Sequence, residues 1–145
     1  MNLFNIRKTF QMKEARGWNE IYFCIDLHGT IIPSGESVTD SNDEKIFYPY
    51  AKEVLKYLSD RKDIKIILWT STPPMRIMNV LKWFVDNEIY FDGVNSNRYA
   101  ANTPRSNFDE KFYFNVLLDD RAGFDPETDW KAIKDELIAI GEWKV

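Results

Sequence analysis

The chain of 145 residues contains one cysteine, Cys24, and one histidine, His28. A single thiol cannot build a disulfide framework or a Cys-x-x-Cys redox pair. One thiol and one imidazole are also too few ligands for a Cys/His zinc cluster. These low counts therefore exclude a disulfide-stabilised protein, a dithiol redox protein and a Cys/His zinc protein.

Long apolar runs are also missing. No stretch approaches the roughly 18 consecutive apolar residues of a membrane-spanning helix. Charges interrupt residues 1–18 before a signal-peptide core can form. We therefore expect no membrane partner and a cytoplasmic location. A basic excess is absent too, since 19 basic and 23 acidic residues give a net charge of −4. That balance argues against a protein that coats nucleic acid and leaves a local basic groove open.

Apolar and aromatic residues are plentiful, at 44% and 15% of the chain, which excludes intrinsic disorder as the main state. The length fits one domain of about 100 to 150 residues. We predict a single domain over residues 1–145, in which residues 1–19 are an N-terminal extension that forms a short helix or an edge strand. We expect the five tryptophans to serve packing.

Segment 21–26 is an apolar run without alternation that ends on an acid, which predicts a strand buried on both faces of a parallel sheet. Segment 64–69 predicts a second buried strand. A short third strand is predicted near residues 91–95 and a fourth over residues 112–120. Residues 29–43, rich in Gly, Pro, Ser, Asn and Asp, predict a loop.

Apolar residues at helical spacing occur after each of the first two predicted strands and again near the C-terminus. One helix is predicted to begin at Pro49, another at Pro73 with Thr72 as its cap, and a last one over about residues 128–140. Strands that alternate with helices predict an α/β fold, a three-layer Rossmann-like parallel sheet with helices on both faces.

Acidic and hydroxyl side chains follow three of the predicted strands: Asp26, Thr70, and Asp119 with Asp120. In parallel sheets ligands bind outside the carboxyl ends of the strands, so we expect these groups to meet there. Crowded carboxylates need a proton or a cation, and an oxygen-only ligand set suits Mg²⁺. A carboxylate can also serve as a nucleophile and form an aspartyl-phosphate. Lys111, ahead of the last strand, could neutralise phosphoryl charge.

Taken in order, these residues resemble the four motifs of the haloacid dehalogenase superfamily. Residues 26–30, Asp-Leu-His-Gly-Thr, are similar to its DxDGT signature. Thr70 stands where the second motif places Ser or Thr, and Lys111 matches the Lys of the third. The pair 119–120 resembles the paired acids of the fourth motif, so the resemblance spans residues 21–125.

The resemblance implies an Mg²⁺-dependent phosphomonoesterase that forms an aspartyl-phosphate on Asp26. It places the metal on Asp26, the backbone carbonyl of His28, and Asp119 or Asp120. It places phosphoryl oxygens on Thr70 and Lys111. A family member of this length lacks a large cap domain, which leaves room for a nucleotide, a polynucleotide 3′-phosphate or a small phosphometabolite; an oligomer is left open.

Three further residues are candidates for binding the substrate. Ser71 offers a second hydroxyl beside Thr70, and Gly29 belongs to the loop that follows Asp26. Arg121 could steer an anionic substrate or pair with the neighbouring acids.

One position departs from the family pattern. The second Asp of DxDGT is the general acid and base of the family, and His28 stands there in this chain. An imidazole with an ordinary pKa of about 6.5 could do the same work, although bound Mg²⁺ disfavours an imidazolium nearby. Two functions are therefore left open: a working phosphatase, and a catalytically weak or inactive module that binds phosphate in a regulatory role.

Overall fold

A four-stranded, all-parallel sheet forms the centre of the computed structural model, which describes residues 5–34, 46–109 and 111–144. Its strands are β1 (Ile21–Asp26), β2 (Ile64–Trp69), β3 (Gly93–Val94) and β4 (Val116–Leu118). The order across the sheet is β3-β2-β1-β4. The chain therefore runs outward from β1 through β2 to β3 and then returns to place β4 on the other side of β1, which creates a topological switch point between β1 and β4.

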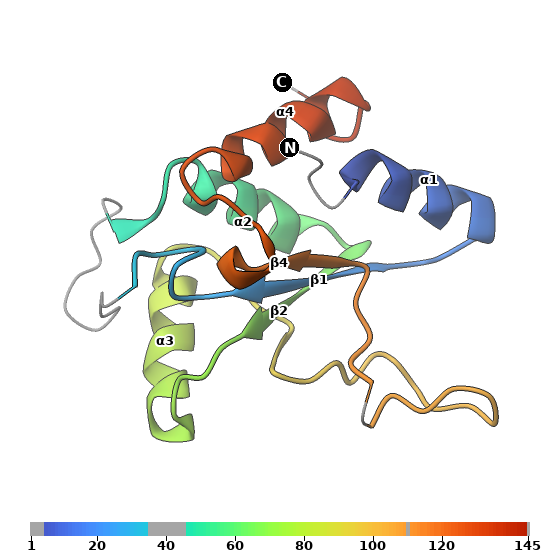
Figure 1. Ribbon diagram of the computed structural model, residues 1–145, viewed down its shortest axis with the longest axis horizontal. Coiled ribbons are helices and arrows are strands. Elements are labelled where there is room, and N and C mark those ends of the chain that lie inside the picture. Colours follow the sequence, from blue (N-terminus) through green and yellow to red (C-terminus); the bar gives the residue numbers. More distant parts are fainter. Residues whose placement is uncertain (1–4, 35–45, 110, 145) are drawn as a thin grey trace.

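The described residues form four α-helices: α1 (Ile6–Arg16), α2 (Ala51–Asp60), α3 (Pro74–Asp86) and α4 (Asp129–Ala139). In Figure 1, α1, α2 and α4 lie above the sheet, whereas α3 and the long connection between β3 and β4 lie below it. This arrangement confirms the expected three-layer, Rossmann-like α/β fold, and the described ranges contain no separate cap domain. No helix in those ranges has the length and apolar character needed to cross a bilayer.

The strand predictions for residues 21–26 and 64–69 match β1 and β2 in both bounds. Most side chains of these strands are fully buried, as expected for central parallel strands. The face of β1 turned away from α2 is covered by the connection 95–115, which we call the long loop. Tyr22 of β1 meets the ring of Tyr113 edge-on, with 5.4 Å between the centroids.

The N-terminal extension contains a helix, which decides between the two expected alternatives. Helix α1 begins after Asn5, whose side chain accepts a hydrogen bond from the N–H of Lys8 at 3.1 Å. Its buried apolar side chains, Ile6 and Phe10, are four residues apart and so share one face. Helices α1 and α4 pack together, so the extension is part of the domain.

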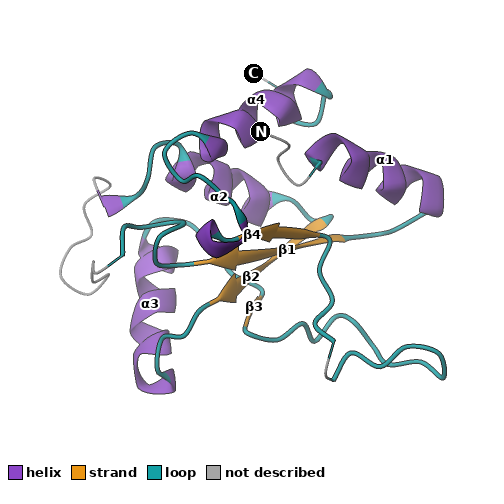
Figure 2. Ribbon diagram, in the orientation of Figure 1, coloured by secondary structure: helices purple, strands orange, loops and turns teal. Residues whose placement is uncertain are grey.

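The prediction of a strand over residues 112–120 was too long, because β4 has only three residues. Just before β4, the side-chain oxygen of Asn115 accepts the hydrogen bond from the N–H of Tyr22 at 2.7 Å, and the N–H of Asn115 donates to the carbonyl of Tyr22 at 2.9 Å. Phe112 and Tyr113 instead turn their rings toward neighbours in the sheet and the long loop. Figure 2 shows this segment as a loop that enters a short strand.

The prediction that Thr72 caps the following helix was wrong. Pro73 precedes helix α3 and makes no capping side-chain bond. The Thr72 hydroxyl lies 2.8 Å from the hydroxyl of Thr70 instead. Within the predicted loop 29–43, residues 35–43 lie outside the described residues.

Candidate functional site

The carboxyl ends of all four strands meet at one pocket of about 570 Å³. Asp26 ends β1, Thr70 follows β2, Asn95 follows β3 and Asp119 follows β4. The pocket is lined by Asp26, His28, Ser34, Trp69, Thr70, Ser71, Asn95, Asp119, Asp120 and Arg121. Every predicted site residue except Gly29 and Lys111 lines this pocket.

Three carboxylates converge in this pocket. Asp26, Asp119 and Asp120 each offer one oxygen, and these oxygens all lie within 4.8 Å of one another. Burial of Asp26, followed by the charge of Asp119, raises the pKa of Asp26 to about 7. The crowding therefore favours a proton or a cation between these groups. An oxygen-only set beside solvent fits a hard divalent cation such as Mg²⁺, which keeps several waters.

The buried hydroxyl of Thr30 connects two of the carboxylate residues. It donates to Oδ2 of Asp26 at 3.0 Å and accepts the hydrogen bond from the N–H of Asp120, also at 3.0 Å. The carbonyl of Thr30 is held in turn by the indole N–H of Trp130 at 2.8 Å. Thr30 was not predicted as a site residue; its hydroxyl within the Asp-Leu-His-Gly-Thr motif was the available signal.

Gly29 has no side chain, and this absence leaves room for the carboxylate of Asp120. Its φ of +86° is in the left-handed region, and a Cβ there would lie 2.7 Å from Oδ2 of Asp120. Its N–H donates to the carbonyl of Ile32 at 2.7 Å. No described residue accepts a hydrogen bond from the N–H of Leu27 or His28, so these two amides, next to Asp26, have donor capacity to offer a ligand.

Asn95 fixes the loop that carries Thr70. Its side-chain oxygen accepts the N–H of Thr70 at 2.8 Å, and its amide donates to the carbonyl of Thr70 at 2.8 Å. Asn95 has a φ of +55°, which asparagine tolerates better than most residues. This residue was missed in the sequence, although it too is a polar side chain directly after a strand.

The segment after β4 presents the remaining polar groups. Asp119 accepts the backbone N–H of Arg121 at 3.0 Å and so caps a short 3-10 helix, Asp120–Ala122. Arg121 is exposed at the pocket wall, where it is the only arginine or lysine among the described lining residues. His28 is exposed on the same pocket, and no residue in the described ranges forms a hydrogen bond with its imidazole.

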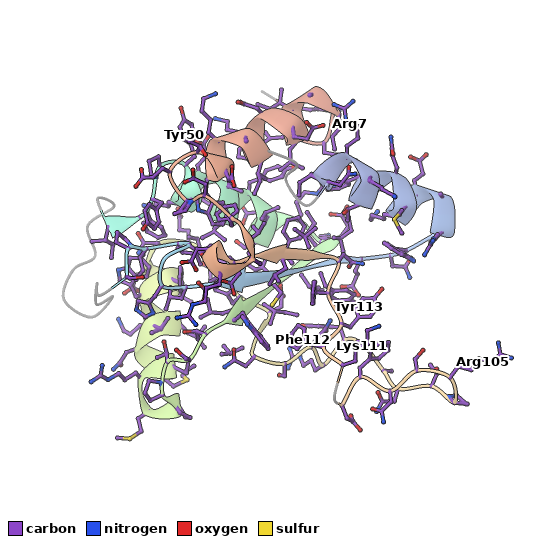
Figure 3. All side chains as sticks on the ribbon, in the orientation of Figure 1. Arg7, Tyr50, Arg105, Lys111, Phe112 and Tyr113 are labelled. Atoms are coloured by element: carbon purple, nitrogen blue, oxygen red, sulfur yellow. The ribbon has the colours of Figure 1, made fainter. Side chains whose placement is uncertain are left out.

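Lys111 does not reach the pocket. It is exposed and lies on the long loop, on the side of the sheet where Phe112 and Tyr113 lie (Figure 3). Phe112, the next residue, meets the ring of Trp69, with 5.0 Å between the centroids. Lys111 precedes β4 in the sequence, as predicted, but it is not among the residues that line the pocket.

Comparison with known proteins supports the fold. No protein-family model matches this chain, and no curated protein matches it. Among solved structures, a conserved protein from Bacteroides thetaiotaomicron is similar, with a TM-score of 0.57 and 21% identity. The match covers 81% of this chain and 93% of that chain. At this identity the likeness shows a shared fold and nothing about activity.

Proposed function

We propose that the protein is an Mg²⁺-dependent phosphomonoesterase of the haloacid dehalogenase type, acting through an aspartyl-phosphate on Asp26. The observation that carries this proposal is the convergence of Asp26, Asp119 and Asp120 within 4.8 Å at the strand ends. The resemblance of residues 26–30 to the DxDGT signature supports it. When bound to these carboxylates, Mg²⁺ would neutralise their charge and that of the phosphoryl group.

The first half of the reaction uses Asp26 as the nucleophile. Its carboxylate attacks phosphorus, and the bond from phosphorus to the ester oxygen breaks. The imidazolium of His28 gives its proton to that oxygen, so that the product leaves as an alcohol. The hydroxyl of Thr30, which donates to Oδ2 of Asp26, holds the carboxylate in one orientation during attack.

The second half restores the enzyme. Neutral His28 takes a proton from a water molecule, whose oxygen attacks phosphorus and releases Asp26 with inorganic phosphate. Phosphoryl oxygens would be held by the N–H groups of Leu27 and His28, the Ser71 hydroxyl and the Arg121 guanidinium. These donors belong to or adjoin the pocket, and such fixed donors stabilise charge that develops in the transition state.

A second function is favoured by the setting of His28. A general base is normally oriented by a third group, and no described residue binds this imidazole. The alternative is therefore a module of the same type that binds phosphate with slow or no turnover. It predicts that a carboxylate at position 28 creates activity.

Phosphate release distinguishes these functions. The wild type, Asp26→Asn and His28→Asp are assayed with Mg²⁺ or with a chelator, on an aryl phosphate, nucleoside monophosphates and a 3′-phosphorylated oligonucleotide. Asp125→Asn is the matched control, because Asp125 is an exposed acid outside the pocket. Metal-dependent release that is lost only in Asp26→Asn supports the phosphatase. Release seen only in His28→Asp supports the binding module, and no release from any variant refutes the phosphatase.

A further inference from the structure

A second pocket, also of about 570 Å³, adjoins the first and shares Trp69 and Asn95 with it. Its other walls come from the long loop, so we call it the loop groove. Aromatic rings of Phe108 and Phe112 and the charged side chains of Arg98 and Asp109 are among its lining. The groove therefore opens directly from the pocket that holds the carboxylates.

The sheet register explains why Trp69 lies beside Asp26. The two residues are partners on the neighbouring parallel strands β1 and β2, so both side chains point to the same face of the sheet. The face is the one that the long loop covers. Trp69 remains 38% exposed, and Phe112 supports its ring from the side at 5.0 Å with 64° between the planes. An indole held in this way offers a stacking surface next to the nucleophile.

The charge of the loop groove differs from that of the first pocket. Arg98 and Asp109 balance each other, whereas the first pocket gathers three carboxylates. A polynucleotide would need several cations along its path, and Arg98 is the only arginine or lysine among the described lining residues of the groove. Arg105 lies at the far tip of the long loop (Figure 3). The groove therefore fits an uncharged group.

Amide side chains give the groove polar edges in fixed positions. The Asn97 amide donates to the carbonyl of Tyr113 at 3.0 Å, and the Asn102 oxygen accepts the N–H of Phe108 at 2.6 Å. Each side-chain NH₂ group has two hydrogens, so the Asn97 amide has a second one to offer a ligand. The aromatic side chains and amide groups of the groove therefore fit a planar ring that carries hydrogen-bonding groups at its edges.

We propose that the substrate is a nucleoside monophosphate whose phosphate lies at Asp26 and whose base stacks on Trp69 in the loop groove. This inference rests on the proposed phosphatase function and names its substrate class. Hydrolysis breaks the bond between phosphorus and the ester oxygen. A proton goes to that oxygen, so the nucleoside leaves as an alcohol, and the oxygen of water bonds to phosphorus, so the phosphate leaves as an anion. Stacking tolerates any base, so several nucleotides would be accepted.

Two esters and three variants test the proposal. We compare kcat/KM for a nucleoside monophosphate and for glycerol phosphate, which has no ring, in the wild type, Trp69→Leu and Phe112→Leu. Trp18→Leu is the matched control, because Trp18 precedes β1 and so lies at the opposite end of the strands. Circular dichroism confirms that each variant is folded. We expect Trp69→Leu to lower the preference for the nucleotide by roughly 5- to 100-fold, the effect of losing one stacked base. Phe112→Leu should lower it less, and Trp18→Leu should leave it unchanged.

The results separate this proposal from the proposed function. Equal efficiency of the wild type on both esters, or a preference that survives Trp69→Leu, overturns the groove assignment while the phosphatase stands. If neither ester is hydrolysed, the phosphatase fails, and calorimetric titration of the same nucleotide then decides the groove alone. Binding that Trp69→Leu weakens supports the groove, whereas absent binding, or binding that Trp69→Leu leaves unaltered, overturns it.

Discussion

Replacing Asp26 with asparagine removes one of three crowded carboxylates and should stabilise the metal-free protein at alkaline pH. The pKa of Asp26 is raised to about 7 in the folded chain, mainly by burial and by Asp119, from 3.8 for an unperturbed group. As the pH rises between these two values, the unfolded chain loses this proton while the folded chain keeps it. The wild type therefore loses stability across this window, and the loss is complete above about pH 7.

The magnitude follows from the same two values. At about 1.4 kcal/mol for each pH unit, the interval corresponds to roughly 4 kcal/mol. Asp26 is only partly buried, and solvent screening reduces the effect to about 2 kcal/mol. Asparagine has nearly the same shape and does not ionise, so Asp26→Asn should gain about 2 kcal/mol over the wild type between about pH 4 and pH 8.

Urea denaturation with a chelator present, followed by circular dichroism across this pH range, measures the difference. Asp125→Asn controls for loss of an acidic charge outside the pocket. A difference between wild type and Asp26→Asn that stays constant with pH, or shrinks as pH rises, would refute the argument from crowding. Added Mg²⁺ provides a second check, because binding to the native state should raise the wild-type Tm more than that of Asp26→Asn.

Three further predictions concern the neighbours of the carboxylates. Gly29→Ala should destabilise the protein more than Gly17→Ala in thermal unfolding, and it should also weaken Mg²⁺ binding in calorimetry. Both glycines have a positive φ, which costs an alanine about 1 to 2 kcal/mol, but only a Cβ at position 29 would clash with Asp120. Equal effects of the two substitutions would contradict the clash. Thr30→Val should cost about 2 kcal/mol in urea denaturation, because it leaves the N–H of Asp120 and the carboxylate of Asp26 without the Thr30 hydroxyl as partner, and Thr30→Ser should recover most of it; an unchanged stability of Thr30→Val would contradict a stabilising role of this hydroxyl. Arg121→Ala should raise KM for phosphomonoesters more than Lys111→Ala, because only Arg121 lines the pocket; the reverse order would show that Lys111 reaches the substrate.

The sequence was sufficient to predict the architecture and the convergence of the side chains that follow the strands. Strands 21–26 and 64–69 were predicted with correct bounds because each consists mostly of apolar residues without strict alternation, which is typical of a strand covered on both faces. The convergence of Asp26, Thr70 and Asp119 followed from chain order, since parallel strands bring their carboxyl ends to one edge. These features depend on local pattern and connectivity, which a sequence displays.

The tertiary structure decided the features that depend on partners distant in the sequence. The side chain of Asn115 bonds to Tyr22, 93 residues away, and Lys111 lies outside the pocket although it precedes β4 closely in the sequence. Thr30 is held by Trp130, 100 residues away. Trp69 borders the candidate site instead of packing in the core because the sheet register places it beside Asp26. Such contacts arise from packing between distant segments, so no local pattern of apolar and polar residues could have indicated them.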